Sequence, residues 1–433
     1  LNAMPQFGSS AGGETILLSG VGFFPAALVS VIWDGIALPP SSVTQLSPTE
    51  LQVVTPPGGG TVLVQVQTPA GTSNSKTFSY DAEVPVAFNG PSKVADVGFP
   101  TTLAWGPDGR LYVASIFGQI TILSFDDAYN VTDTQTVNTL TGLDNNAILG
   151  IAFDPFDSNQ SEPKIYVSHS KLFAHHGGSC GPGGEMVEEY SPYTGQISTL
   201  SGPDFDTLVP VITGLPVSNH DHGVNGLQFD DQGDLFIAVG GITNAGVFDC
   251  AIGGLPESPF SAAVLKAELS KAGFNGTIQY VGRPGAGVVD PSDQREAANV
   301  DVVPGVDITV FAPGLRNPFD IVWTTEGALY ASDNGPNLNF GAASTGPNTQ
   351  GPDPETDDQI SLLEAGNYYG HANRNRGLND ARQYIYYNAE TAPAIPGTYE
   401  SPLGLFTASS NGLTEYRATT FNSAMRGDLL LQR

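Results

Sequence analysis

Basic residues are scarce in this sequence. Its 433 residues include 16 lysines and arginines against 44 aspartates and glutamates, which gives a formal net charge of −28. Affinity for nucleic acid comes mainly from lysine and arginine side chains that neutralise phosphates, and anionic lipid surfaces attract the same side chains. The sequence also lacks a run of about 18 apolar residues, which a bilayer-spanning helix requires. We therefore expect no nucleic-acid partner and no insertion into a membrane.

Cysteine is almost absent, and the two that occur, Cys180 and Cys250, could form one disulfide across two long loops. Three Asn-X-Ser/Thr sequons, at Asn130, Asn159 and Asn275, would accept glycans in a protein secreted by a eukaryote. The sequence begins with neither an initiator methionine nor a signal peptide, so we expect a processed or partial chain. Together with the acidic, lysine-poor composition, these features predict an extracellular protein, either secreted or at a cell surface.

Charged residues make up only 14% of the chain, whereas glycine (52 residues) and proline (33 residues) are abundant. This composition favours turns and short strands over long helices. Near the N-terminus, stretches such as residues 62–67 alternate between apolar and other residues, and glycine or proline clusters interrupt them. Alternation with regular turn signals predicts a small, all-β sandwich in this part of the chain.

Residues 5–80 resemble an IPT/TIG immunoglobulin-like domain. The resemblance rests on four short motifs: GVGF (20–23), WDG (33–35), TPP with the glycines after it (55–60) and FSY (78–80). Domains of this type act as spacers or interaction modules, so the resemblance implies contacts with other extracellular proteins and no catalytic role. We assign residues 1–81 to this domain and expect a short linker at 81–85, because proline ends strands and restricts its neighbour.

The remainder of the sequence repeats one pattern of two apolar strands around a turn. The copies are LAWGPDGRLYVAS (103–115), IAFDPFDSNQSEPKIYVSHS (151–170), LQFDDQGDLFIAVG (227–240), IVWTTEGALYASD (321–333) and a weaker MRGDLLLQR (425–433). Turn residues such as Pro107, Asp108 and Gly109 suit a hairpin, so each copy is predicted to be antiparallel. Recurrent antiparallel units predict a β-propeller, with a second β-sandwich as the alternative.

Residues 85–433 resemble the glucose/sorbosone dehydrogenase family. The motifs, in order, are AILGIAFDP (147–155), Asp221-His222 five residues before Leu227, GLRNP (314–318), SDNGP (332–336), DDQI (357–360) and GNYYG (366–370). The resemblance implies a six-bladed β-propeller over residues 82–433, which in enzymatic members binds pyrroloquinoline quinone (PQQ) and calcium. Because the sequence ends near where the fifth blade should continue, the last blade is expected to be incomplete in this chain.

The resemblance implies a catalytic role for His222. In the enzymes of this family, the corresponding histidine removes a proton from the sugar hydroxyl while a hydride passes to the quinone. An imidazole suits this role because its pKa lies near neutrality. His222 keeps the family's spacing to Leu227, and Asp221 beside it matches a cofactor-binding position. In the alternative interpretation, His220 and His222 belong to a polar loop in which their side chains cap backbone groups.

Arg316 and Asn317 match positions that contact quinone and substrate, so the resemblance implies that both are catalytic and that Arg316 also binds the cofactor. A guanidinium can pair with the carboxylates of PQQ. Arg417 falls near the position of a cofactor-binding lysine, and the main-chain oxygens of Gly335 and Pro336 match the calcium ligands. The alternative for Arg316 is a structural arginine that fixes propeller loops through backbone carbonyls.

The sequence departs from the family's pattern at several positions. Gly241 replaces a pocket aspartate, Gln359 replaces a glutamate, and Phe319 with Asp320 replaces an expected glutamine. The acidic residues of the stretch 353–358 form either a structural calcium loop or, the interpretation we favour, a solvated surface.

Two functions therefore remain open. The first, which we favour narrowly, is a secreted oxidoreductase that depends on PQQ and calcium and acts on an aldose or a related sugar. The second is a non-catalytic extracellular glycoprotein for adhesion, recognition or structure, in a filament or matrix, that uses the propeller as a scaffold. In both cases the expected partner of the propeller is a sugar or polysaccharide.

Overall fold

The fold is described from a computed structural model of the chain. The structure describes all residues except 5–6, 21, 82–91, 175–192, 246–252, 338–355, 372–382, 385–393, 396–397, 408, 420–424 and 433. It is nearly all β, with 3% helix, which confirms the predicted fold class. Within the described residues, no helix is long and apolar enough to cross a membrane.

The chain divides into two compact units, Leu1–Pro91 with Tyr416–Arg426, and Ser92–Glu415 with Gly427–Arg433. The domain boundary predicted at residues 81 and 82 stays a prediction, because residues 82–91, with most of the expected linker, lie outside the described part of the chain.

Two sheets form the N-terminal unit. Their strand orders are β1-β3-β7-β6 and β2-β10-β8-β4-β5, with β9 paired to β8. The elements are β1 (Asn2–Met4), β2 (Phe7–Ser9), β3 (Thr15–Ser19), η1 (Ala26–Leu28), β4 (Ser30–Trp33), β5 (Ile36–Ala37), η2 (Pro40–Ser42), β6 (Val43–Ser47), β7 (Glu50–Val54), β8 (Gly60–Thr68), β9 (Gly71–Thr72) and β10 (Lys76–Asp81).

The alternating apolar residues of these strands meet in a single core. Val31, Leu51, Val64 and Phe78 are fully buried there, as expected where every second residue of a strand faces inward. The predicted small β-sandwich is confirmed.

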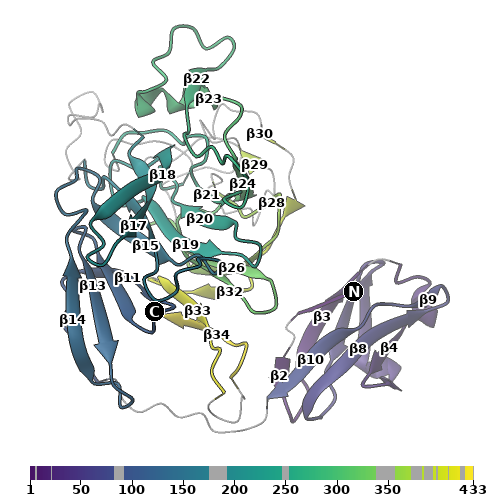
Figure 1. The fold of residues 1–433 in the computed structure, drawn as a ribbon. Helices are drawn as coiled ribbons and strands as arrows, with labels where there is room; N and C mark the ends of the chain where they lie inside the picture. The colour runs from purple at the N-terminus through teal and green to yellow at the C-terminus, as the bar shows by residue number, and fades with distance from the viewer. Residues whose placement is uncertain are drawn as a thin grey trace. The chain divides into compact units, whose positions relative to one another are not determined.

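Among the described residues, the second unit contains four antiparallel sheets of four strands each and four two-stranded sheets (Figure 1). The four sheets consist of β11 (Pro100–Trp105), β12 (Leu111–Ser115), β13 (Ile120–Phe125) and β14 (Val131–Val137); β15 (Ala147–Ala152), β16 (Ile165–Ser170), β17 (Gly195–Ser201) and β18 (Thr207–Leu215); β19 (Val224–Phe229), β20 (Leu235–Val239), β21 (Ala263–Ala267) and β24 (Ile308–Pro313); and β25 (Pro318–Trp323), β26 (Leu329–Asp333), β27 (Asp358–Leu363) and β32 (Gly404–Phe406).

The remaining elements are short. They are β22 (Tyr280–Gly282) paired with β23 (Val300–Val302), η4 (Gln294–Asn299), β28 (Asn367–Tyr368) with β31 (Thr398–Tyr399), β29 (Gln383–Tyr384) with β30 (Ala394–Ile395), and β33 (Gly412–Glu415) with β34 (Leu429–Gln432).

The first strands of successive sheets are neighbours, in the order β11, β15, β19, β25 and β33. Polar contacts join them: Thr101 Oγ1 donates to the carbonyl of Ile148 at 2.6 Å, and Asn225 Nδ2 donates to the carbonyl of Pro318 at 2.9 Å. Sheets that meet through their first strands surround a common axis, which is the arrangement of a propeller. The number of blades implied by the resemblance stays a prediction.

Four of the five predicted hairpins are confirmed, as the pairs β11–β12, β15–β16, β19–β20 and β25–β26. Gly109, in the first turn, has a φ of +78°, which glycine adopts without steric cost. The fifth copy, at 425–433, was wrong as a hairpin: it contains only β34, whose partner β33 lies at Gly412–Glu415. The segment 425–433 is too short to contain two paired strands and the turn between them.

Asp320 of β25 lies where three of these first strands meet. Its Oδ2 accepts the N–H of Leu413 on β33 at 3.0 Å. A Cβ on Gly226 of β19 would approach its Oδ1 to 3.0 Å. Burial raises the pKa of Asp320 to about 7, against hydrogen bonds from the backbone that lower it. One carboxyl group thus connects neighbouring sheets and changes its charge near neutral pH.

Relative to the wild type, Asp320→Asn is expected to be more stable at pH 8 than at pH 4 by on the order of 2 kcal/mol. Its amide nitrogen cannot accept one of the two backbone N–H groups that the carboxyl accepts, but that loss is the same at both pH values. The folded-state pKa lies above the ordinary value of 3.8. The stability that the protonated group contributes is therefore complete below the ordinary value and is lost as pH rises through the folded value. Thermal unfolding at both pH values measures the effect. Asp231→Asn, at an exposed turn residue, is the control, and equal stabilisation at pH 4 and pH 8 would contradict the prediction.

Candidate active site

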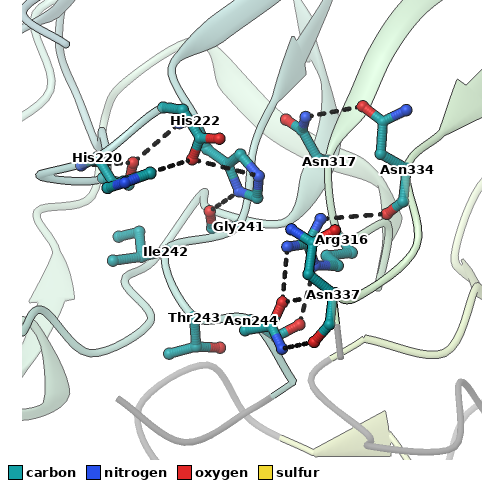
Figure 2. A network of polar contacts seen from close by, with 12 residues as sticks. His220, His222, Gly241, Ile242, Thr243, Asn244, Arg316, Asn317, Asn334 and Asn337 are labelled. Carbon is teal, nitrogen blue, oxygen red and sulfur yellow. Dashed lines mark hydrogen bonds and ion pairs between the residues drawn. The ribbon is translucent and has the colours of Figure 1, made fainter. Parts of the chain in front are cut away.

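Four loop segments meet at one end of the third and fourth sheets (Figure 2). Residues 218–223 precede β19 and residues 240–245 follow β20, while residues 314–317 precede β25 and residues 334–337 follow β26. In an antiparallel hairpin, the start of the first strand and the end of the second lie at the same end. The site is therefore assembled from the open ends of two adjacent hairpins.

His222 is buried in this site, with 8% of its surface exposed. Its Nδ1 lies 2.7 Å from the carbonyl oxygen of Gly241. Because a carbonyl only accepts hydrogen bonds, Nδ1 carries the proton, and Nε2 of the neutral ring is unprotonated. Burial lowers the pKa of His222, although Asp221, whose Oδ1 is 3.8 Å from Nε2, opposes this effect. At neutral pH the ring is therefore a free base at Nε2.

His220 has a different environment from His222. Its Nδ1 lies 2.8 Å from Oδ1 of Asp221, and this interaction raises the pKa of His220 against the effect of burial. Burial alone would raise the pKa of Asp221, but His222, His220 and Arg316 together hold it below its ordinary value. Asp221 is thus ionised and lies between the two imidazoles. These environments favour His222, rather than His220, as the base.

Arg316 is buried, with 3% of its surface exposed, and its guanidinium contacts neutral oxygens. Nε donates to the carbonyl of Asn244 at 2.9 Å, Nη2 to Oδ1 of Asn244 at 2.8 Å, and Nη1 to the carbonyl of Asn334 at 3.4 Å. The carbonyl of Arg316 itself accepts the N–H of Gly241 at 2.6 Å. Gly241 therefore connects the arginine to His222. Two of the guanidinium contacts agree with the alternative interpretation of Arg316 as an arginine that fixes loops.

Asn317 links three strands at the edge of the site. Its Nδ2 donates to Oδ1 of Asn334 at 3.0 Å, its Oδ1 accepts from Nδ2 of Asn225 at 2.9 Å, and its N–H donates to Asp333 at 2.7 Å. The amide side chain is thus held on both sides, and the structure gives Asn317 a fixed position beside Arg316 (Figure 2).

Gly335 and Pro336, the predicted calcium ligands, follow Asn334 in the same segment. The N–H of Gly335 donates to Oδ1 of Asp358 at 2.9 Å, and the carbonyl of Pro336 accepts the N–H of Thr356 at 3.2 Å. A Cβ at Gly335 would lie 2.1 Å from the carbonyl oxygen of Thr356, so only glycine fits. A carbonyl oxygen has a second lone pair, and calcium accepts carbonyl ligands. The two carbonyl oxygens of this segment are thus of a type that calcium accepts.

Carboxylates do not gather at this segment. Over the residues that the structure describes, no group of three or more histidine, cysteine, aspartate or glutamate side chains is suited to a metal ion. The prediction that the acidic stretch is solvated was wrong for Asp358, which is buried and accepts from Gly335, Asn334 and the N–H of Ser410. Residues 353–355 lie outside the described part of the chain.

Several predicted residues are not placed at the site. Arg417 follows β33 and groups with the N-terminal unit, so its cofactor role stays a prediction. Cys180 and Cys250 lie outside the described residues. The sequon residues are all exposed, away from strand interiors: Asn130, Asn159 and Asn275.

Sequence reasoning missed the residues that position the predicted ones. Asn244 and Asn225 hold Arg316 and Asn317, and the buried pair Glu257 and His371 lies behind Gly241. Asn244 follows the Gly240-Gly241 turn, which could have signalled a loop at the site. Glu257 and His371 are 114 residues apart, and no local pattern relates them.

Comparison with known proteins agrees with the resemblances found in the sequence. Residues 2–80 match the IPT/TIG domain family. Over 327 residues, or 75% of this chain, the sequence is 24% identical to quinoprotein glucose dehydrogenase B from Acinetobacter calcoaceticus. The chain spans 59% of the length of that curated relative.

Two solved structures are also similar. The PQQ-bound form of aldose sugar dehydrogenase from Streptomyces coelicolor is 17% identical, with a TM-score of 0.42 over 74% of this chain and 73% of that one. A glucose dehydrogenase crystal structure is 18% identical, with a TM-score of 0.45 over 78% of this chain and 82% of that one. The chain therefore joins an IPT/TIG domain to a region similar to quinoprotein sugar dehydrogenases.

Proposed function

We propose that this chain is an oxidoreductase that oxidises an aldose or a related sugar with the aid of PQQ and calcium, and that His222 is its base. The similarity to a quinoprotein glucose dehydrogenase supports the reaction class. The observation that carries the proposal is the hydrogen bond from Nδ1 of His222 to Gly241, because it leaves Nε2 unprotonated in a ring whose pKa is lowered by burial.

The proposed reaction converts the sugar's C–OH group to a carbonyl. PQQ, when bound, would supply the acceptor for the hydride of the C–H bond. Nε2 of His222 takes the proton of the hydroxyl group, which leaves the oxygen able to form the double bond to carbon. The resulting imidazolium keeps its Nδ1–H on Gly241 and lies 3.8 Å from the ionised Asp221, which stabilises the new charge.

Other residues of the site would hold the cofactors. Arg316 provides a buried positive charge suited to the carboxylates of PQQ, and Asn317 provides an amide fixed beside it. The carbonyls of Gly335 and Pro336 would bind calcium, which accepts such ligands readily.

We further propose that the protein is extracellular and glycosylated, with a Cys180–Cys250 disulfide. The exposure of Asn130, Asn159 and Asn275 supports glycosylation, since a glycan requires an accessible asparagine. The intact mass of protein from its natural source, before and after glycan removal and reduction, tests both modifications.

Titration of the full-length natural protein with PQQ in the presence of calcium, followed by its absorbance spectrum, tests the proposed function. We expect saturable binding that chelation of calcium weakens, and dye reduction that depends on an added aldose. If the protein binds no PQQ, the proposal fails. The contacts of Arg316 with backbone carbonyls then favour the second function, in which the propeller is a non-catalytic extracellular scaffold.

A further inference from the structure

The buried side chains of Glu257 and His371 pair directly behind Gly241. Nε2 of His371 and Oε1 of Glu257 are 2.7 Å apart, and their side chains are 1% and 2% exposed. The N–H of His371 donates to the carbonyl of Gly314, so the pair is also joined to the segment that leads to Arg316. The pair thus adjoins both Gly241 and the segment that carries Arg316.

The carboxylate of Glu257 gathers donors from the loop after β20. Its oxygens accept the N–H of Ile242 at 3.0 and 3.1 Å, the N–H of Thr243 at 2.9 Å, the hydroxyl of Thr243 at 2.7 Å and the hydroxyl of Ser261 at 2.6 Å. Burial alone would raise the pKa of Glu257, but His371 and the hydroxyl donors hold it at about 2. Glu257 is therefore a fixed negative charge.

One peptide group connects this charge to His222. The carbonyl of Gly241 accepts Nδ1–H of His222, and the N–H at the other end of the same peptide group, that of Ile242, donates to Glu257. Hydrogen bonds in series polarise one another, so a negative charge at the N–H end strengthens the carbonyl as an acceptor. A stronger acceptor at Nδ1 fixes the tautomer and makes Nε2 more basic.

The pair also fills the space that a side chain at position 241 would need. A Cβ on Gly241 would lie 2.7 Å from the carbonyl oxygen of Arg316, 3.0 Å from Nε2 of His371 and 3.2 Å from Oε1 of Glu257. A buried carboxylate, that of Glu257, thus lies one peptide group away from the imidazole.

We infer that Glu257, held by His371, is a positioning residue that orients His222 through the peptide group between Gly241 and Ile242. Its importance for catalysis rests on the proposed function, whereas its effect on the imidazole does not. The other charged groups that face His222 are Asp221 and Arg316, and both stay unchanged in the variants that test the inference.

NMR of the imidazole nitrogens in the full-length, cofactor-free protein tests the inference, with His222→Gln to identify the resonances of His222. We expect the wild type to carry the proton on Nδ1. Glu257→Gln should lower the pKa of His222 by about 0.5 to 1 unit, because a negative charge is lost at the end of the series. Ser261→Ala, the matched control, removes one donor to Glu257 but keeps the charge, and it should leave that pKa unchanged.

His371→Gln separates this role from general loosening of the loop. It keeps the charge of Glu257 and a donor to it but removes the imidazole, so the pKa of His222 should stay the same or rise. If the substitutions acted only by loosening the loop, the pKa of His222 would shift in the same direction in Glu257→Gln and in His371→Gln. An Nε2–H tautomer in the wild type, or the same pKa and tautomer in wild type and Glu257→Gln, would overturn the inference. If Glu257→Gln does not fold, a lowered pKa of His222 in His371→Gln overturns it.

These outcomes are separable from those of the proposed function, because the NMR samples contain neither quinone nor sugar. A shifted His222 in a protein that binds no PQQ would leave the positioning role standing and remove the oxidoreductase. If the wild type reduces dye in the presence of sugar but the pKa of His222 is the same in Glu257→Gln, only the positioning role is excluded. If both proposals hold, Glu257→Gln should lower kcat/KM about tenfold. The acid limb of the pH profile of kcat/KM should also move to lower pH, by the same amount as the pKa of His222.

Discussion

His222→Ala is expected to lower kcat for sugar-dependent dye reduction by about 10²- to 10⁴-fold, the usual contribution of a positioned general base. The binding of PQQ should be nearly unchanged, because the nitrogen that acts on the sugar proton is Nε2, and no cofactor role is assigned to it. Added imidazole should restore part of the activity, since the substitution leaves space where the ring was. Stopped-flow dye reduction with saturating PQQ and calcium measures the loss.

Stability must be separated from chemistry in this variant. The alanine leaves the carbonyl of Gly241 without its partner, which costs about 1–3 kcal/mol of folding free energy. His222→Gln keeps an amide donor near that carbonyl, so its free energy of unfolding should be closer to that of the wild type than the alanine variant's is. It should nevertheless be as inactive as the alanine variant. His169→Gln, which also replaces a buried imidazole whose Nδ1 lies 2.7 Å from a backbone carbonyl, is the matched control and should keep its activity. A folded, PQQ-loaded His222→Ala with nearly wild-type kcat would exclude His222 as the base.

The fold was predictable because its signals are local. A strand pair such as β19–β20 is encoded locally, within residues 224–239, by apolar side chains around a turn containing Gly233, whose φ is +86°. The outer strands of the sheets have no comparable signal. β24, for example, pairs with β21 across a long loop that contains β22, β23 and η4. The sequence of such a loop does not determine where the chain rejoins the sheet.

The site was predictable only where motifs identify it. His222 and Arg316 lie in recognisable segments, and the structure connects both to Gly241. The partners of these residues come from distant loops, since Glu257 and His371 meet across 114 positions. Burying a polar group requires a hydrogen-bond partner, but many polar residues could provide one. A sequence therefore indicates that a buried arginine needs acceptors without indicating that Asn244 provides them.

Gly241 illustrates how a departure from a family's pattern changes meaning in three dimensions. In the sequence it appears as the loss of a carboxylate. In the structure its N–H, its carbonyl and its missing side chain are all used, by Arg316, His222 and the Glu257–His371 pair. The arginine, the imidazole and the buried pair are therefore all held at Gly241.

Arg316→Ala is expected to weaken PQQ binding by at least about 30-fold, because truncating one partner of a buried, hydrogen-bonded charge pair costs about 2 kcal/mol or more. The charge of the guanidinium lowers the pKa values of both His222 and Asp221. Arg316→Lys should bind PQQ with intermediate affinity, because it keeps the charge but loses the planar fork. Fluorescence titration with PQQ at fixed calcium gives the three dissociation constants.

The same variants distinguish a cofactor-binding arginine from a purely structural one. Arg316→Ala also removes the donors to Asn244 and Asn334, so it should destabilise the fold in either case. Arg110, in the turn between β11 and β12, has a guanidinium that contacts Asp108 and Gln135, and it provides the control. If Arg316 binds PQQ, Arg316→Ala and Arg110→Ala should both lower the melting temperature while only the former raises the dissociation constant. Equal affinities in the two folded variants would show that Arg316 serves the loops alone.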